Sequence, residues 1–235
     1  EIKDEFGEVT NYCGIFTDLS ERKTIEDKLQ KQQFQDHLTD ISNRHSLIER
    51  MNVLLNSSES HTKHAVFFLN LNRFKQVNET LGNLTGDQLL VEVAKRIKSL
   101  LKNKDILARY GSDEFVFTIT NISTAREAAL FADAVIKKIQ EPIIIDNNEL
   151  LVSASVGISI YPEDGTTVDQ LIIHADKAMA YSKENDRTGF SFFFDELKTD
   201  ANRVLVLDQE LRKAVDNKQF ELHYQPKVDL KTMQI

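Results

Sequence analysis

The sequence has almost no cysteine, no excess of basic residues and no long hydrophobic run, and each shortage excludes a class of protein. A single cysteine, Cys13, excludes an internal disulfide and fits a reducing compartment. There are 29 Lys and Arg against 37 Asp and Glu, a net charge of -8. This balance argues against binding to duplex nucleic acid, which needs a basic face. Apolar runs such as "AVFFL" (65–69) are far too short to span a bilayer.

The first residues also lack an initiator methionine and a signal peptide, because they are acidic and polar. We therefore expect a cytoplasmic fragment of a longer protein. In residues 1–19, the turn "FGEV" and the alternating "YCGIF" predict the last hairpin strand of a preceding β domain. Residues 20–38 begin with a capping residue, Ser20, and carry a sparse apolar stripe. They predict a connecting helix that pairs with a second copy of itself.

From about residue 40 the hydrophobic pattern alternates between helix and strand. The predicted helices cover 46–58, 86–103, 124–140 and 167–185. The predicted strands are 64–71, a hairpin over 105–120 that turns at Gly111-Ser112, a long strand over 149–162 ended by Pro162, and 189–194. This order predicts an α/β (α+β) fold, in which helices flank a mixed central sheet. From residue 201 onward the sequence predicts a further helix and then a new strand.

The strand at 64–71 ends in two amides, Asn70 and Asn72, at the point where catalytic proteins often carry carboxylates for a metal. A helix that starts directly after a strand offers backbone N–H groups and a positive dipole, so Phe74 and Lys75 lie where phosphates are held. The hairpin tip carries Asp113 and Glu114, and carboxylates are ligands that Mg²⁺ prefers.

Two further pairs are candidates for ligand contacts. Asn78 and Asp87 can read a base, because guanine offers N–H donors. Lys183 and Arg187 are four residues apart and can hold outer phosphates. Each has an ordinary alternative: the cations can be solvated, "GSDEF" can be an acidic turn, Asn78 can lie on a helix surface, and Asp87 can be an N-cap.

Taken together, these segments resemble the GGDEF domain of diguanylate cyclases over about residues 36–195. The segments that carry the resemblance are "DHLTDISNR", "NLNRFKQVNETLGNLTGDQLL", "RYGSDEF", "SVGIS" with "YP", and "AD-K-AM". The resemblance implies a fold similar to the palm of nucleotide polymerases. It also implies that two GTP-loaded domains face each other to make cyclic di-GMP, with two metal ions, Mg²⁺ or Mn²⁺.

The resemblance implies a role for each candidate residue. The metal would be held by residue 70, the backbone carbonyl of Leu71, and Asp113, with Glu114 as a second catalytic acid. The remaining roles are guanine recognition by Asn78 and Asp87, and phosphate binding by Phe74, Lys75, Lys183 and Arg187. A product-inhibition site would lie at Lys102 and Asp105.

The chain departs from the family pattern at several of these positions. Asn70 and Asn72 replace acids, and an amide brings no negative charge to a divalent cation, so we expect weakened metal binding and chemistry. Asp40 and Ser112 stand where glycine is usual, and we expect Ser112 to crowd the phosphates or strain its φ angle. Lys102 lacks the planar fork of arginine, so we expect weak or no product binding.

The flanking segments extend the resemblance to a PAS–GGDEF–EAL protein. Residues 1–19 resemble the end of a PAS domain, 20–38 a signalling helix, 39–195 the GGDEF domain, and 196–235 a linker with the truncated start of an EAL domain. Three hypotheses follow: a GTP-binding regulator of an adjacent EAL phosphodiesterase, a slow diguanylate cyclase, or a nucleotide-free relay that dimerises through its helix. GTP, proteins of cyclic di-GMP signalling and a second copy of the chain are the expected partners.

Overall fold

The computed structural model describes residues 2–3, 5–11, 33–59, 62–146, 148–185, 189–193 and 214. Strands β1 (Ile2–Lys3) and β2 (Val9–Asn11) pair antiparallel, as a hairpin in the first 19 residues requires. Most of the predicted signalling helix, and all but one residue of the predicted EAL segment, lie outside the described residues.

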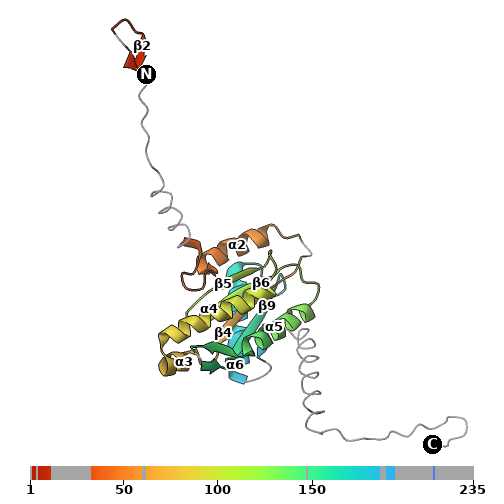
Figure 1. Cartoon of the computed structure of the whole chain (residues 1–235). Helices are drawn as coiled ribbons and strands as arrows, with labels where there is room; N and C mark the ends of the chain where they lie inside the picture. Colours follow the sequence, from red (N-terminus) through yellow and green to blue (C-terminus); the bar gives the residue numbers. More distant parts are fainter. Residues whose placement is uncertain are drawn as a thin grey trace, which may run out of the picture.

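A six-stranded mixed sheet forms the centre of the domain (Figure 1). Its strands are β3 (Ser42–Asn43), β4 (His64–Leu71), β5 (Ile106–Arg109), β6 (Glu114–Ile119), β9 (Ala154–Tyr161) and β10 (Phe190–Phe192), in the order β10-β9-β4-β6-β5-β3. The four central strands pair antiparallel, and the two edge strands pair parallel with their neighbours. The predicted fold class and the hairpin at 105–120 are confirmed.

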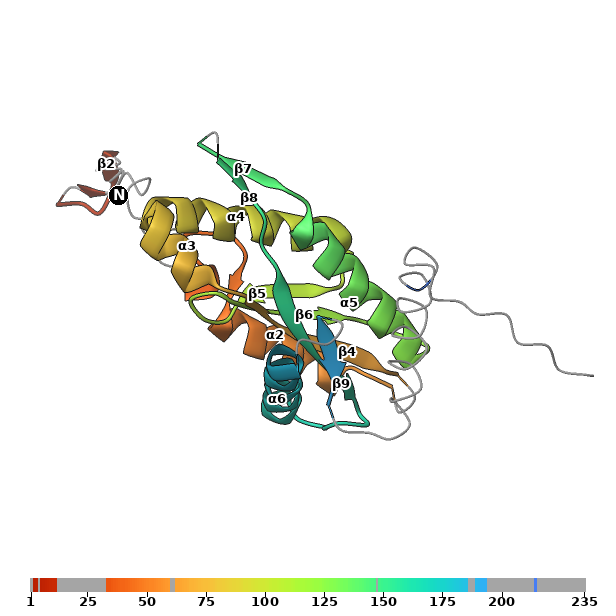
Figure 2. The same cartoon turned by 90° about the horizontal axis from the view of Figure 1, so that it is seen from below.

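Helices cover both faces of this sheet, as the view from below in Figure 2 shows. Helices α4 (Asn83–Leu100) and α5 (Ala125–Gln140) pack on one face, and α2 (Arg44–Asn56) and α6 (Val168–Asn185) on the other. A short helix, α3 (Phe74–Leu81), lies between β4 and α4. All eight residues of β4 are buried, because both faces of the central strand are covered.

The two hydrophobic cores have different contents. The face under α4 and α5 contains stacked aromatic rings, with the centroids of Phe67 and Phe117 4.8 Å apart. On the other face α6 crosses β9 so closely that a Cβ at Gly157 would collide with the backbone of Ala175 and Met179. This close approach fixes α6 over the sheet and brings its last turns toward the end of β4.

The single strand predicted over 149–162 is wrong. The chain instead forms strand β8 (Asn148–Leu150), leaves the sheet over three residues, and enters β9. The reason is that β8 pairs with β7 (Ile143–Ile145) in a separate hairpin, whereas β9 pairs with β4. The predicted end of β9 before Pro162 is confirmed.

Candidate functional site

The end of β4 is the point where three parts of the fold meet. Asn70 lies opposite Glu114 on β6 and opposite Ser155 on β9. Residues opposite each other in antiparallel strands project from the same face of the sheet. Even-numbered neighbours on β4 belong to the core under α2 and α6, so these three residues face the α6 side. Only 7% of Asn70 is exposed.

Helix α6 adds a cation to this point. The ammonium of Lys183 donates a hydrogen bond to Oδ1 of Asn70, with Nζ and Oδ1 2.9 Å apart. The structure therefore brings together a residue predicted to bind phosphate and the residue at the predicted metal position. The second predicted phosphate cation, Arg187, lies outside the described residues.

Three carboxylates accompany the lysine. Burial raises the pKa of Glu114, the negative charges of Asp113 and Asp176 raise it further, and the Lys183 ammonium opposes the rise. Burial also raises the pKa of Asp176. Sequence reasoning missed Asp176 as a site residue. It lies seven residues, about two helical turns, before Lys183, and this spacing would have placed both on one face of α6.

The donor atoms at the end of β4 do not fit the two-metal site that the family pattern implies. Asn70 offers a neutral amide oxygen, and that oxygen already accepts from an ammonium. Within the described part of the chain, no group of three or more His, Cys, Asp or Glu side chains is arranged to hold a metal ion. A divalent cation at Oδ1 of Asn70 would gain no negative charge from this residue and would lie close to the ammonium of Lys183.

The hairpin tip is tied to its surroundings by several hydrogen bonds. The backbone N–H of Leu71 donates to the carbonyl of Asp113 at 3.1 Å, joining the tip to β4. Arg109 donates to the carbonyl of Ser112 at 2.8 Å, and its other amine donates to both carboxylate oxygens of Asp36 at 3.2 and 3.3 Å. The backbone of the tip is therefore held in place by the fold.

The contacts of Asp36 with Arg109 and Thr39 also change the pKa of its carboxyl group. Burial alone would raise the pKa of Asp36, but hydrogen bonds from Thr39 and the charge of Arg109 outweigh it, so its pKa is lowered. The backbone N–H of Thr39 donates at 2.9 Å and its hydroxyl at 2.7 Å. The ionised carboxylate thus links the start of the domain to the base of the tip.

The two positions where glycine is usual behave differently. Asp40 adopts φ 56°, a left-handed conformation that aspartate tolerates better than most residues. Ser112 is not among the residues with positive φ, so the expected backbone strain is wrong. Its hydroxyl instead donates to Oδ1 of Asp113 at 2.8 Å, which orients that carboxylate.

The second asparagine of the strand end joins two strands. Its Nδ2 donates to Oγ of Ser153 at 3.2 Å, and its Oδ1 accepts from Oγ of Ser155 at 3.0 Å. The backbone N–H of Asn72 also donates to the carbonyl of Ser153. This amide is therefore used in holding β9 against the end of β4.

Helix α3 begins at Phe74, as expected, but the two residues at its start differ. The side chain of Phe74 is 8% exposed and packs in the core, so only its backbone can face a ligand. The side chain of Lys75 is 88% exposed and lies 3.6 Å from Glu79. Arg73, just before the helix, has a left-handed φ of 59° and gives the helix no side-chain cap.

The turn between α3 and α4 brings the two predicted base-reading residues close in space. A Cβ at Gly86 would collide with Oδ1 of Asn78, so the two helices touch there, and Asp87 is the next residue. Oδ1 of Asn78 is buried with no hydrogen-bond partner among the described residues, although the residue as a whole is partly exposed on α3. The N-cap alternative for Asp87 is wrong, because α4 begins at Asn83.

The predicted inhibitory pair forms a tight turn. Oδ2 of Asp105 accepts from the backbone N–H of Lys102 at 2.8 Å. Its Oδ1 accepts from the backbone N–H of Thr120 at 3.0 Å. Both carboxylate oxygens are thus occupied within the fold, and Asp105 is only 9% exposed.

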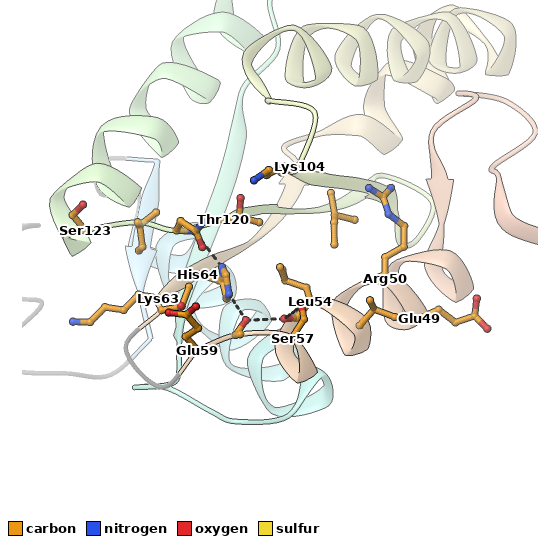
Figure 3. A pocket seen from close by; sticks show the side chains of 16 residues that line it. Glu49, Arg50, Leu54, Ser57, Glu59, Lys63, His64, Lys104, Thr120 and Ser123 are labelled. Carbon is orange, nitrogen blue, oxygen red and sulfur yellow. Dashed lines mark hydrogen bonds between the residues drawn. The ribbon is translucent and has the colours of Figure 1, made fainter.

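A large cavity of about 1040 Å³ lies at the opposite end of β4 (Figure 3). His64 borders it and is almost fully buried. Its Nδ1 accepts from the backbone N–H of Asn121 at 3.2 Å, and its Nε2 lies 2.7 Å from Oγ of Ser58. That hydroxyl donates to the carbonyl of Leu54 at 2.7 Å. Both ring nitrogens are satisfied, so this is a structural histidine.

Comparison with known proteins places the chain among signalling domains. The family model "Diguanylate cyclase, GGDEF domain" matches residues 33–189. The chain is 40% identical over 194 residues to the bifunctional diguanylate cyclase/cyclic di-GMP phosphodiesterase MucR of Pseudomonas aeruginosa, covering 82% of this chain and 28% of MucR. It is 36% identical over 212 residues to the cyclic di-GMP phosphodiesterase PdeR of Escherichia coli, covering 90% and 32%. The chain thus spans about a third or less of these relatives.

Solved structures agree with this match. The GGDEF domain of TpbB from Pseudomonas aeruginosa superposes with a TM-score of 0.64 at 32% identity, covering 67% of this chain and 99% of that one. A sensory box/GGDEF family protein from Caulobacter crescentus gives a TM-score of 0.62 at 36% identity, covering 64% and 98%. In the described ranges no helix has the length and apolar character that a bilayer crossing requires.

Proposed function

Because this chain belongs to the GGDEF domains of cyclic di-GMP signalling, we propose that it is a degenerate member that binds GTP without converting it. In this proposal, GTP binding regulates an adjacent EAL phosphodiesterase of a longer PAS–GGDEF–EAL protein. The curated relatives include a bifunctional cyclase/phosphodiesterase and a phosphodiesterase, which is consistent with a regulatory role for the domain.

The observation that carries this proposal is the side chain at the end of β4. GGDEF cyclases use Mg²⁺ or Mn²⁺ with GTP, yet Asn70 offers a neutral oxygen that is already bonded to Lys183. Without a metal, neither activation of the attacking hydroxyl nor polarisation of the α-phosphate has a source. A loss of about 4 kcal/mol of transition-state stabilisation slows a reaction about a thousandfold.

The binding half of the proposal rests on the α3–α4 junction. Asn78 has an unpaired acceptor there, and Asp87 is exposed beside it. An unpaired buried acceptor costs about 1–3 kcal/mol, and a rearrangement that lets it meet an N–H donor recovers this cost. Guanine carries such donors, and a carboxylate accepts from them. The start of α3 adds backbone N–H groups for phosphates.

A slow cyclase is the second candidate, and one observation favours it. Asp113 and Glu114 are both present at the tip, and burial with its acidic neighbours raises the pKa of Glu114. A carboxyl group whose pKa is raised can act as a general acid or base.

Calorimetric titration of the chain with GTP and with ATP tests the binding half. We expect saturable GTP binding and at least tenfold weaker ATP binding. The absence of GTP binding would leave the nucleotide-free relay. The regulatory half requires the longer protein, in which GTP should change the rate of cyclic di-GMP hydrolysis, and an Asp87→Ala variant should not respond.

A further inference from the structure

The most exposed apolar side chains of the domain gather on one side of it. Among the described residues between 33 and 193, the large apolar residues with the highest exposure are Leu84 at 81%, Ile144 at 77% and Leu151 at 75%. Leu84 lies in the first turn of α4, and the other two lie on or directly after the β7–β8 hairpin. Leu84 and Ile144 both line a groove of about 810 Å³ between α4 and the hairpin. Exposed apolar side chains gathered in this way mark a surface that binds a partner.

The groove is formed by the fold itself, because Arg96 fastens the hairpin to α4. Its guanidinium donates to the carbonyl of Pro142 at 2.8 Å, directly before β7, and its side chain is only 11% exposed. Ile143 and Ile145 pack in the core, so Ile144 between them faces outward. Figure 2 shows the hairpin leaving the end of α5 and reaching along α4 toward its first turns. Both walls of the groove are therefore in place before a partner binds.

The groove carries more negative than positive charge. Asp87 on α4 and Asp146 at the turn of the hairpin line it, and both are exposed. Neither carboxylate has a hydrogen-bond or ion-pair partner among the described residues. Glu92 and Arg96 offset each other, with Oε1 and Nε 3.2 Å apart, which leaves Lys95 as the exposed cation among the described lining residues. A second copy of this surface would bring carboxylates against carboxylates, whereas a basic partner complements them.

We propose that this groove binds a partner helix that carries apolar side chains on one face and lysine or arginine beside them. The apolar face covers Leu84, Val91 and Ile144, and the cations pair with Asp87 and Asp146. In the proposed function Asp87 also reads guanine, so one part of this inference rests on that function: GTP and the helix compete for the same carboxylate. Competition of this kind lets bound GTP release the partner, and the coupling is reciprocal.

Fluorescence anisotropy of the whole chain with a labelled synthetic helix tests the inference. The probe, named the Lys helix, has about 18 residues, with leucine at helical spacing and lysine elsewhere. The matched Glu helix has glutamate in place of each lysine. We expect the Lys helix to bind at least about tenfold more tightly than the Glu helix, because only the first complements the carboxylates. Saturating GTP with MgCl₂ should weaken binding of the Lys helix at least about fivefold.

Matched variants locate the binding surface. Leu84→Ser and Ile144→Ser should each weaken binding of the Lys helix about tenfold or more, because each removes an apolar contact. Val53→Ser changes a side chain on α2 that is 69% exposed, and it should bind like the parent chain. Asp146→Asn should weaken binding about three- to fivefold, whereas Asp169→Asn, an exposed position on α6, should not. Circular dichroism verifies that each variant is folded.

The outcomes separate the inference from the proposed function. Equal binding by Ile144→Ser and the parent chain would overturn the docking surface, and GTP titration would still decide the proposed function. A chain that binds GTP without releasing the Lys helix would overturn the competition. Helix binding at the groove without any GTP binding would leave the surface standing and overturn the proposed function. Tighter binding of the Lys helix to an Ile25→Ser, Leu29→Ser variant than to the parent would assign the groove to residues 20–32 of the chain and overturn the partner helix. Self-association of the parent chain that Ile144→Ser abolishes would assign the groove to a second copy and overturn it as well.

Discussion

The polar groups at the two ends of strand β4 differ in how completely they are paired. At one end His64 is buried beside a cavity of about 1040 Å³, and both of its ring nitrogens have partners. Six residues along, about 20 Å away, Asn70 lies among a lysine and carboxylates. There the pKa values of Glu114 and Asp176 are raised, and nearby Asn78 has an unpaired oxygen.

This difference distinguishes polar groups that stabilise the fold from polar groups that can bind a ligand. A satisfied polar network stabilises the fold and gains nothing from a ligand. Carboxylates with a raised pKa, and acceptors without a donor, are not fully stabilised by the protein itself. A ligand that supplies a donor or a positive charge can stabilise them. The presence of a cavity is a poorer guide, because the cavity of about 1040 Å³ lies at the satisfied end.

The largest effect on stability is expected for the anchor of the hairpin tip. Arg109→Met should lower the free energy of unfolding by about 2–3 kcal/mol, because the side chains of Arg109 and Asp36 are only 14% and 15% exposed. Lys63→Met, at the His64 end, breaks the more exposed ion pair between Lys63 and Glu163. It should change the free energy of unfolding by about 0.5 kcal/mol or less. Urea unfolding measures both, and equal losses would contradict the contrast.

A large effect on binding is expected for the base-reading carboxylate. Asp87→Ala should weaken GTP binding about tenfold to a hundredfold, because hydrogen bonds to a charged acceptor contribute about 1.5–3 kcal/mol. The free energy of unfolding of the Asp87→Ala variant should change by about 0.5 kcal/mol or less, since Asp87 is exposed. Calorimetry gives the affinity, and a His64→Gln variant should bind GTP like the parent chain. Normal GTP affinity of Asp87→Ala would show that the carboxylate does not read the base.

The contribution of His64, at the fully hydrogen-bonded end of β4, to the free energy of unfolding should depend on pH. Burial lowers the pKa of His64, so in the window below about 6.5 the unfolded chain binds a proton that the folded chain does not. The free energy of unfolding should therefore fall as the pH is lowered through this window, by at most about 1.4 kcal/mol per pH unit. His64→Gln should remove this part of the slope in urea unfolding. Equal slopes for both proteins would show that His64 is not responsible.

A smaller effect than at the Arg109 anchor is expected at the turn itself. Ser112→Gly should destabilise the fold by about 0.5–1 kcal/mol, because Ser112 has no positive φ to relieve and glycine adds freedom to the unfolded chain. The variant also loses the hydroxyl that orients Asp113. A rise in melting temperature would instead indicate the strain that the sequence pattern suggested.

Local patterns predicted most of the fold. The apolar run of β4 and the turn at Gly111-Ser112 gave correct elements, because burial and turn chemistry act over a few residues. The break at 151–153 could not be predicted, since it depends on which strand β8 pairs with.

The candidate site was only partly predictable. The individual residues follow from motifs, but the bond between Asn70 and Lys183 joins positions 113 apart in the chain. Such a contact depends on how α6 packs over β9, which no local pattern specifies. The role of Asn72 also depended on tertiary structure, because its partner Ser155 lies on β9 and its partner Ser153 directly precedes that strand.

The most direct test is chromatographic detection of cyclic di-GMP after long incubation of the chain with GTP and Mg²⁺, and then with Mn²⁺. An active cyclase serves as the positive control. If the Asn70 end holds nucleotide without converting it, no product should form above the blank in either metal. Product from this chain that disappears on Asp113→Ala would show that the two asparagines suffice for catalysis and would contradict the degenerate site.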